Sequence, residues 1–508
     1  MAESRIQYSA DPEVLGLLDR AFIRATGSPR IDGNRVRILR DAKENFTAWL
    51  DAIANAQRTI LFESYLWRDD EIGQKFAAAL GARARDGIRV YVIYDWLGSF
   101  AADDLWAGLR AEGAQVRVFN RFALDSPLGW VSRDHRKSIA IDGNVGFVTG
   151  VCISSAWLGD PAKNMDPWRD TGVEIHGPAV AALEEAFAEV WLACGGPALP
   201  KDDLTNPDDI FRAGDVAVRV IAGKPSAAGV FRLDQLVASA ARKYLWLTDA
   251  YFVGVAPYVQ ALCAAARDGV DVRLLVPGVS DIAALKPLSR TGYRPLLAAG
   301  VKVYEWNGAM LHAKTAVADG LWARVGSTNL NFASFIQNWE LDVAIEDPEF
   351  ADEMAKMYRQ DLTGATEIVL TQRNRVRATA EAPATPRARK AFAGSASRAA
   401  AGALSVGNAM GAALTNRRVL GPAESGLLVQ LALVALAIAI VAFLWPRTLA
   451  YPLAVIAAWI GISMIVKAWG LRQQKAPPPA TPLPKTAIDN DAERERVARV
   501  ERSDTRGG

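Results

Sequence analysis

Short apolar runs alternate with helical stretches along most of the chain. Thr59–Tyr65 and Tyr244–Leu247 are apolar runs of the length expected for strands. A helical stretch that ends at Arg-Asp-Gly follows each run. A second apolar run comes after that stretch, Val90–Tyr94 in one case and Val272–Val276 in the other. Strands that alternate with helices are typical of a sheet with helices on both faces. We therefore predict an α/β fold.

The pattern occurs twice, and its parts come in the same order both times. Residues 84–93, for example, resemble residues 266–275. Matches that keep their order indicate an internal duplication. We predict two duplicated α/β/α sandwich halves, residues 1–210 and 211–372, which pack about a pseudo-twofold axis with the active site between them.

The C-terminal third has a different composition. Residues 373–423 are rich in alanine and carry scattered arginines, which predicts a basic linker. Ser425–Trp445 and Leu449–Val466 then carry no charged residue, and about 20 such residues span the hydrocarbon core of a bilayer. Neither run has the polar face of a helix on a soluble domain. We predict two transmembrane helices within residues 424–469, joined as a hairpin, and a disordered tail at residues 470–508.

Flanking charges predict the orientation of this hairpin. Arg417 and Arg418 precede it and several basic residues follow between Lys467 and Lys475, whereas Arg447 stands alone at the tip. Positive flanks stay in the cytoplasm. We therefore expect the catalytic region and the tail to face the cytosol. The first residues contain no apolar core of a cleaved signal peptide.

Charge and cysteine content narrow the function classes. The formal net charge is only +2, whereas nucleic-acid-binding proteins usually carry a much more basic surface. The three cysteines, Cys152, Cys194 and Cys263, show no paired spacing, so they predict neither a disulfide framework nor a zinc site. We expect no nucleic-acid partner, no metal and no cofactor.

Two of the three histidines open the same short motif, His-x-Lys followed by Asp five residues later. The two copies consist of His135, Lys137 and Asp142, and of His312, Lys314 and Asp319. On a strand, residues i and i+2 point to the same face, so an imidazole and an ammonium can converge on one phosphate group. The third histidine, His176, has no such lysine, and we expect no catalytic role for it.

Several further motifs make the chain resemble the phospholipase D superfamily, and within it the bacterial cardiolipin synthase group. They lie at Asp95–Ser99, Trp168–Asp170, Gly177–Val180, Gly326–Asn329 and Asn338–Glu340. The resemblance covers about residues 35 to 372. It implies metal-independent chemistry on a phosphodiester, with His135 as the nucleophile and His312 as the acid and base.

The residue types suit this chemistry. One imidazole can attack phosphorus to form a phosphohistidine while the other protonates the leaving alcohol. Lys137 and Lys314, with Ser327 and Asn329, can donate hydrogen bonds to the phosphate oxygens.

Four carboxylates complete the predicted site. Asp170 and Glu340 are expected to orient the imidazoles, unless they are surface or capping carboxylates. Asp142 and Asp319 belong to the catalytic motif, although we favour a structural role for them at the turns before Gly143 and Gly320.

One position departs from the family pattern. Cys152 stands in the first half where Asn329 stands in the second. A thiol cannot supply the amide donor that asparagine offers to a phosphate oxygen. The departure indicates either different roles for the two halves or reduced activity.

Four functions fit these observations. The leading hypothesis is a membrane-anchored phosphatidyltransferase of the cardiolipin synthase type, which acts on anionic phospholipids such as phosphatidylglycerol at the bilayer. It implies a bacterial inner (cytoplasmic) membrane. The alternatives are a phospholipase D that hydrolyses phospholipids to phosphatidic acid, a nuclease of the same superfamily and a non-enzymatic membrane scaffold.

Overall fold

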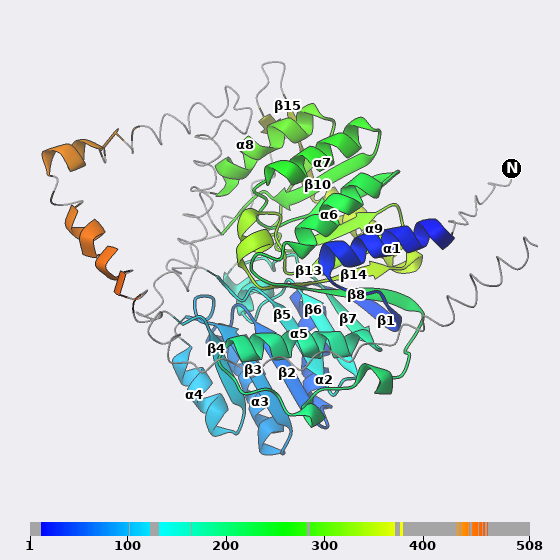
Figure 1. Cartoon of the computed structure of the whole chain (residues 1–508), viewed down its shortest axis with the longest axis vertical. Coiled ribbons are helices and arrows are strands. Elements are labelled where there is room, and N and C mark those ends of the chain that lie inside the picture. Colours follow the sequence, from blue (N-terminus) through cyan, green and yellow to red (C-terminus); the bar gives the residue numbers. More distant parts are fainter. Residues whose placement is uncertain are drawn as a thin grey trace, which may run out of the picture. The chain divides into compact units, whose positions relative to one another are not determined.

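The computed structural model describes residues 12–100, 102–121, 132–163, 165–281, 285–370, 376–378 and part of 433–465. The chain divides into two units, Met1–Pro446 and Arg447–Gly508. The helices and strands labelled in Figure 1 all lie in the first unit.

Sixteen strands of the described residues form one mixed sheet. They are β1 (Ile31–Arg40), β2 (Thr59–Ser64), β3 (Arg89–Asp95), β4 (Gln115–Phe119), β5 (Lys137–Ile141), β6 (Val145–Thr149), β7 (Thr171–His176), β8 (Val216–Gly223), β9 (Tyr244–Thr248), β10 (Asp271–Pro277), β11 (Lys302–Trp306), β12 (Thr315–Ala318), β13 (Trp322–Gly326), β14 (Glu340–Glu346), β15 (Ala365–Leu370) and β16 (Val376–Ala378).

The strand order repeats. One side of the sheet runs β4-β3-β2-β5-β6-β7-β1, and the other side has the matching order β11-β10-β9-β12-β13-β14-β8. In each half the first three strands are parallel and the others antiparallel. The prediction of an α/β fold is confirmed. The two halves do not form separate sheets, however, because β1 pairs antiparallel with β8 and joins them.

Helices cover both faces of each half. They are α1 (Pro12–Thr26), α2 (Asp41–Ala54), α3 (Glu71–Arg85), α4 (Asp103–Ala111), α5 (Ala179–Ala193), α6 (Gly229–Ala240), α7 (Ala256–Arg267), α8 (Leu285–Ala298) and α9 (Pro348–Thr363). Helices α2 to α4 pack on one face of the first half and α6 to α8 on one face of the second (Figure 1). Helices α5 and α9 pack on the other faces and share one apolar core.

Burial on both faces explains why the central strands are almost continuously apolar. All six residues of β2 are buried. Phe62 packs in the core beneath α2 and α3, whereas Leu61 points to the opposite face and packs in the core beneath α5. A strand covered on both sides has no solvent-facing positions, so its sequence does not alternate between apolar and polar residues.

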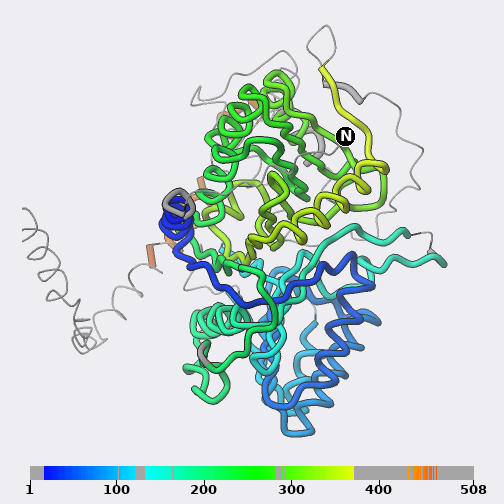
Figure 2. The backbone as a smooth tube through the Cα atoms, turned by 90° about the vertical axis from the view of Figure 1, so that its right-hand side faces the viewer, coloured from blue at the N-terminus to red at the C-terminus, as the bar shows by residue number. Residues whose placement is uncertain are grey.

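The N-terminal helix packs on the second half. Helix α1 contacts α6, and Asp19 forms an ion pair with Arg219 of β8. Figure 2 shows this dark blue helix beside the green segments of the second half, away from the blue and cyan lobe that the following residues form. Helix α1, which was predicted to belong to the first half, thus packs on the second half.

The predicted transmembrane hairpin lies mostly outside the described residues. Within the part of the chain that the structure describes, no helix combines the length and apolarity needed to cross a bilayer. The described positions between 433 and 465 are largely helical and carry exposed apolar side chains, among them Phe443, which is 86% exposed, and Val455. The predicted linker and tail also lie outside the described residues, except for Val376–Ala378 in β16.

Candidate active site

Both histidine motifs begin just before a strand. Strand β5 starts at Lys137 and β12 at Thr315, so each histidine lies in the extended segment ahead of its strand rather than within it. The expected placement of the whole motif on a strand is wrong by two or three residues. The histidines are nevertheless fixed, because the backbone N–H of His135 donates to the carbonyl of Trp339 at 2.8 Å and that of His312 to the carbonyl of Arg169 at 2.7 Å.

These backbone bonds cross between the halves and bring each imidazole to a carboxylate of the other half. Nδ1 of His135 lies 2.9 Å from Oε2 of Glu340, which opens β14. Nδ1 of His312 lies 2.8 Å from Oδ2 of Asp170, which precedes β7. A carboxylate at Nδ1 holds the proton on that nitrogen and leaves Nε2 as the basic atom. The structure thus brings together the four residues in two crossed pairs.

Each carboxylate is itself held by a donor from its own half. Oγ of Ser327 donates to Oε2 of Glu340 at 2.6 Å, and the indole Nε1 of Trp157 donates to Oδ2 of Asp170 at 2.9 Å. Ser327 was expected to bind a phosphate oxygen, but in the structure its hydroxyl hydrogen goes to Glu340. It positions the carboxylate that holds His135.

The two lysines lie beside their histidines in different arrangements. Nζ of Lys137 donates to the backbone carbonyl of His135 at 2.5 Å. Nζ of Lys314 lies 3.0 Å from Nε2 and 2.8 Å from Nδ1 of His312, and it also donates to the carbonyl of that residue. Each ammonium also faces a tyrosine ring, Tyr65 for Lys137 and Tyr251 for Lys314.

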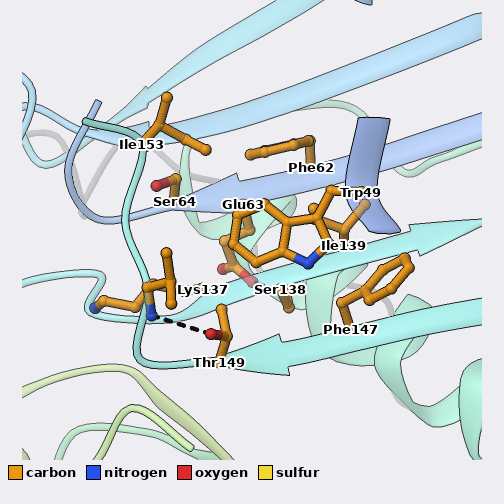
Figure 3. A pocket seen from close by; sticks show the side chains of 11 residues that line it. Trp49, Phe62, Glu63, Ser64, Lys137, Ser138, Ile139, Phe147, Thr149 and Ile153 are labelled. Carbon is orange, nitrogen blue, oxygen red and sulfur yellow. Dashed lines mark hydrogen bonds between the residues drawn. The ribbon is translucent and has the colours of Figure 1, made fainter. Parts of the chain in front are cut away.

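A small cavity lies next to Lys137. It measures about 10 Å³ and is lined mainly by apolar residues such as Trp49, Phe62 and Phe147 (Figure 3). This volume is about the minimum that accommodates one water molecule.

Burial and charge make both imidazoles neutral in the resting site. Burial lowers the pKa of His135 to about 4, although Glu340 opposes the shift. Burial and the Lys314 ammonium lower the pKa of His312 to about 3, against the effect of Asp170. Each imidazole is also influenced by the lysine of the other half, so the two motifs share one electrostatic environment. Burial likewise lowers the pKa of Lys314 to about 8.

These shifts predict a loss of stability in acid. An ordinary histidine in the unfolded chain takes up a proton below about pH 6.5, whereas the folded protein resists protonation of His135 until about pH 4. The free energy of unfolding should therefore decrease as the pH falls from about 6.5 to about 4, by up to about 1.4 kcal/mol per pH unit for each histidine. Urea unfolding at a series of pH values would measure the slope. A His135→Asn variant with the wild-type slope would contradict the assignment.

Asp142 and Asp319 lie at the far ends of β5 and β12, away from the imidazoles. Both adopt a left-handed backbone, with φ of 58° and 55°. The carboxylate of Asp142 accepts hydrogen bonds from the backbone N–H groups of residues 57 to 59, and that of Asp319 from residues 242 to 244. Their grouping with the catalytic residues is therefore corrected. Both have a structural role, as expected, but their carboxylates hold the segments that lead into β2 and β9 rather than only the turns before Gly143 and Gly320.

Asn329 and Cys152 occupy equivalent buried positions. Among the described residues, Oδ1 of Asn329 has no hydrogen-bond partner. The Cys152 thiol is 2% exposed, and burial raises its pKa while Lys137 and Lys314 oppose the shift. The charges of both lysines therefore act on the Cys152 thiol.

Cys152→Asn is expected to fold and to retain at least the wild-type activity. Asparagine is close to cysteine in size and adds the amide donor that the second half already has. Turnover of a phospholipid substrate, compared with the wild type and with Cys152→Ala as a size control, measures the effect. A folded but inactive Cys152→Asn would show that the thiol has its own function.

Sequence reasoning missed several residues that hold the site. The guanidinium of Arg169 donates to both oxygens of Asp361 in α9 at 2.8 to 3.1 Å, which ties the segment before Asp170 to the second half. Tyr65 and Tyr251 pack edge-on against His135 and His312. The two tyrosines occur in corresponding parts of the duplicated sequence, a signal that could have identified them.

The comparisons with known proteins agree with this geometry. Residues 235–362 match the family model described as cardiolipin synthase, PLD-like domain. Cardiolipin synthase A of Pseudomonas aeruginosa is 34% identical over 370 residues, which cover 70% of this chain and 73% of that protein. A cardiolipin synthase of Geobacillus kaustophilus is 33% identical over 339 residues, which cover 66% of this chain and 67% of that protein.

Among solved structures, phosphatidylserine synthase from Haemophilus influenzae has a similar fold. Its TM-score is 0.56 at 16% identity, and the match covers 68% of this chain and 91% of that one. At this identity the likeness concerns the fold alone. The relatives that are 34% and 33% identical over 70% and 66% of this chain show the family. The chain belongs to the cardiolipin synthase family of phospholipase D-like proteins.

Proposed function

We propose that the protein is a phosphatidyltransferase of the cardiolipin synthase type that works through a phosphohistidine. The crossed pairs His135–Glu340 and His312–Asp170 are the observation that supports it most. Two neutral imidazoles with basic Nε2 atoms, beside two ammonium groups, suit a two-step displacement at a phosphodiester. The relatives named cardiolipin synthase support a phospholipid as substrate.

In the first step, Nε2 of His135 attacks phosphorus as the P–O bond to the leaving alcohol breaks. The alcohol takes a proton from His312, and the phosphatidyl group stays on His135. Among the described residues, none hydrogen bonds to Nε2 of His135, whereas Nε2 of His312 contacts Lys314. This asymmetry supports His135 as the nucleophile and His312 as the group that exchanges protons.

A bound substrate would raise the pKa of His312, whose imidazole must be protonated before it can act as an acid. The Lys314 and Lys137 ammonium groups both lower the pKa of His312. A phosphodiester anion held by these lysines offsets their charge, so the imidazole gains a proton more easily. In the second step neutral His312 accepts the proton of an incoming alcohol, whose oxygen attacks phosphorus and releases His135.

The acceptor alcohol distinguishes synthesis from hydrolysis. Phosphatidylglycerol, an anionic phospholipid, has a free glycerol headgroup that can attack, and transfer to it gives cardiolipin and glycerol. The test is incubation of the purified full chain with labelled phosphatidylglycerol. Cardiolipin as a product supports the proposal, whereas phosphatidic acid without cardiolipin would replace it with phospholipase D activity.

We further propose that residues 424–469 anchor the protein in the inner (cytoplasmic) membrane of a bacterium as a helical hairpin, with the catalytic region in the cytosol. The two uncharged runs and the exposed apolar side chains of the described positions there support the anchor. Removal of residues 424–508 should release the protein from membranes washed at high pH. Continued membrane retention of the truncated chain would contradict the anchor.

A further inference from the structure

Two buried carboxyl groups lie next to each other beneath the first histidine motif. Glu63 of β2 is 1% exposed and Asp134, which directly precedes His135, is fully buried. Oε1 of Glu63 and Oδ2 of Asp134 receive no hydrogen bond from any donor in the described part of the chain. The two side chains are nevertheless close enough to hydrogen bond to each other. Two carboxylates cannot form such a bond unless one of them carries a proton.

The remaining atoms of the pair are already engaged. Oγ of Ser138 donates to Oε2 of Glu63 at 2.9 Å, and the backbone N–H of Arg136 donates to Oδ1 of Asp134 at 3.3 Å. Glu63 and Ser138 are also paired in register on β2 and β5, as Figure 3 shows from close by. Glu63 thus connects to residues on both sides of His135, at positions 134 and 138.

The charges around the pair favour a single proton. The Arg136 guanidinium faces the pair, and its three nitrogens donate to the neutral carbonyls of Glu340, Ala186 and Gly223. Among the described residues, the one carboxylate that forms an ion pair with it, Oε2 of Glu189, lies 3.9 Å from Nη2 and is partly exposed. If the pair holds one proton, its single negative charge faces the positive charge of Arg136. If both groups were ionised, the pair would carry one negative charge more than Arg136 offsets. Burial raises the pKa of both Glu63 and Asp134.

Other titratable groups face the pair from neighbouring elements. Asp95 of β3 raises the pKa of Asp134, but the Arg133 guanidinium lies 3.2 Å from Asp95 and offsets its charge. Lys137 lowers the pKa of Glu63. The Cys194 thiol lies near both carboxyls, and burial together with their charges keeps it protonated.

We propose that Asp134 and Glu63 share one proton, and that the resulting bond, from Oδ2–H of Asp134 to Oε1 of Glu63, positions the backbone of the His135 motif. Both are positioning residues rather than catalytic ones. The second half has no such pair: Leu311 precedes His312, and Thr248 stands opposite Thr315 where Glu63 stands opposite Ser138. The carboxyl pair therefore lies in the half that carries the proposed nucleophile.

Raising the pH should break the bond. A carboxyl pair that binds its proton more tightly in the folded chain than in the unfolded chain stabilises the fold at low pH, and the gain is lost as the pH rises through the folded pKa. The wild type should then lose thermal stability and turnover number on the alkaline side, while the KM for substrate changes little, because the shared proton touches the nucleophile's backbone and not the substrate.

Asp134→Asn is the decisive variant. Its amide can donate to Oε1 of Glu63 and its carbonyl can still accept from Arg136, so the bond persists without a titratable proton. We expect turnover within about threefold of the wild type near neutral pH, because one hydrogen-bond donor to the Glu63 carboxylate replaces another. We also expect a flatter alkaline decline of both the melting temperature and the turnover number. Asp134→Ala, which leaves Glu63 without a donor, should lose most activity or fail to fold.

The positioning role rests on the proposed function, whereas the shared proton can be measured without substrate. The infrared carbonyl band of a protonated carboxyl group should be present in the wild type at mildly alkaline pH and weaker in Asp134→Asn. Glu174→Gln is the matched control, since Glu174 of β7 is ionised and bonded to Arg37 and His176. Identical infrared bands and alkaline melting profiles in wild type and Asp134→Asn would overturn the shared proton. An Asp134→Asn variant as inactive as Asp134→Ala would overturn the positioning role.

Discussion

His135→Ala should reduce phosphatidyl transfer by at least about 10⁴-fold, since removal of a covalent nucleophile typically costs this much. His312→Ala should lose a comparable factor with an ordinary alkoxide leaving group. The two variants differ with a substrate whose leaving group is a weakly basic phenol, which needs no proton. On that substrate His312→Ala should still form the phosphohistidine, and His135→Ala should not.

Mass spectrometry of the protein after rapid acid-free quenching measures the phosphorylated histidine directly. Both variants should keep the wild-type fold, because each imidazole makes only one of several contacts between the two halves. Formation of the intermediate on His312 in the His135→Ala variant would reverse the assigned roles. Near-full activity of either variant would contradict the site as a whole.

Asp170→Asn and Glu340→Gln should each lower turnover by roughly 10² to 10⁴-fold while the chain stays folded. An amide in place of the carboxylate at Nδ1 can stabilise the wrong tautomer of the imidazole, and in a hydrolase triad the same change has an effect at the upper end of this range. Because the pairs cross between the halves, Glu340→Gln should slow phosphohistidine formation on His135. Asp170→Asn should instead weaken proton transfer by His312.

The weakly basic phenol ester separates these two effects as well. Asp170→Asn should recover much of its first-step rate on that substrate, whereas Glu340→Gln should not. Ser327→Ala offers a graded control, since it leaves the Glu340 carboxylate in place and removes the hydrogen bond from Ser327 to it, along with the one that Ser327 accepts from the backbone N–H of Leu341. Recovery of Glu340→Gln by the activated substrate would mean that Glu340 serves the proton-transfer step instead.

The strands could be predicted from the sequence because their pattern is local. The run Thr59–Tyr65 ends one residue beyond β2, and Val90–Tyr94 lies within β3. The duplicated motifs also identified both histidines and both lysines. The crossed pairing of imidazole and carboxylate could not be predicted, since it depends on how strands far apart in the chain meet. The junction of β1 with β8 is equally non-local.

Residues with two possible uses were the hardest to predict. Ser327 can donate either to a phosphate or to a carboxylate, and only the position of Glu340 decides between them. Helix α1 carries an apolar face but no indication of which half it covers, and it packs on α6. The meeting of Glu63 with Asp134 depends on strand register, which a single sequence does not reveal.

Neither half holds its motif histidine together with the carboxylate that orients it, so neither can be an enzyme by itself. A nick in the connection near Phe211, which is 91% exposed, would yield two fragments that each keep one of the two motif histidines, His135 or His312, and lack the carboxylate that holds it. Turnover should return only when the fragments reassociate across the β1–β8 junction. Loss of that junction would therefore inactivate the protein before either half unfolds.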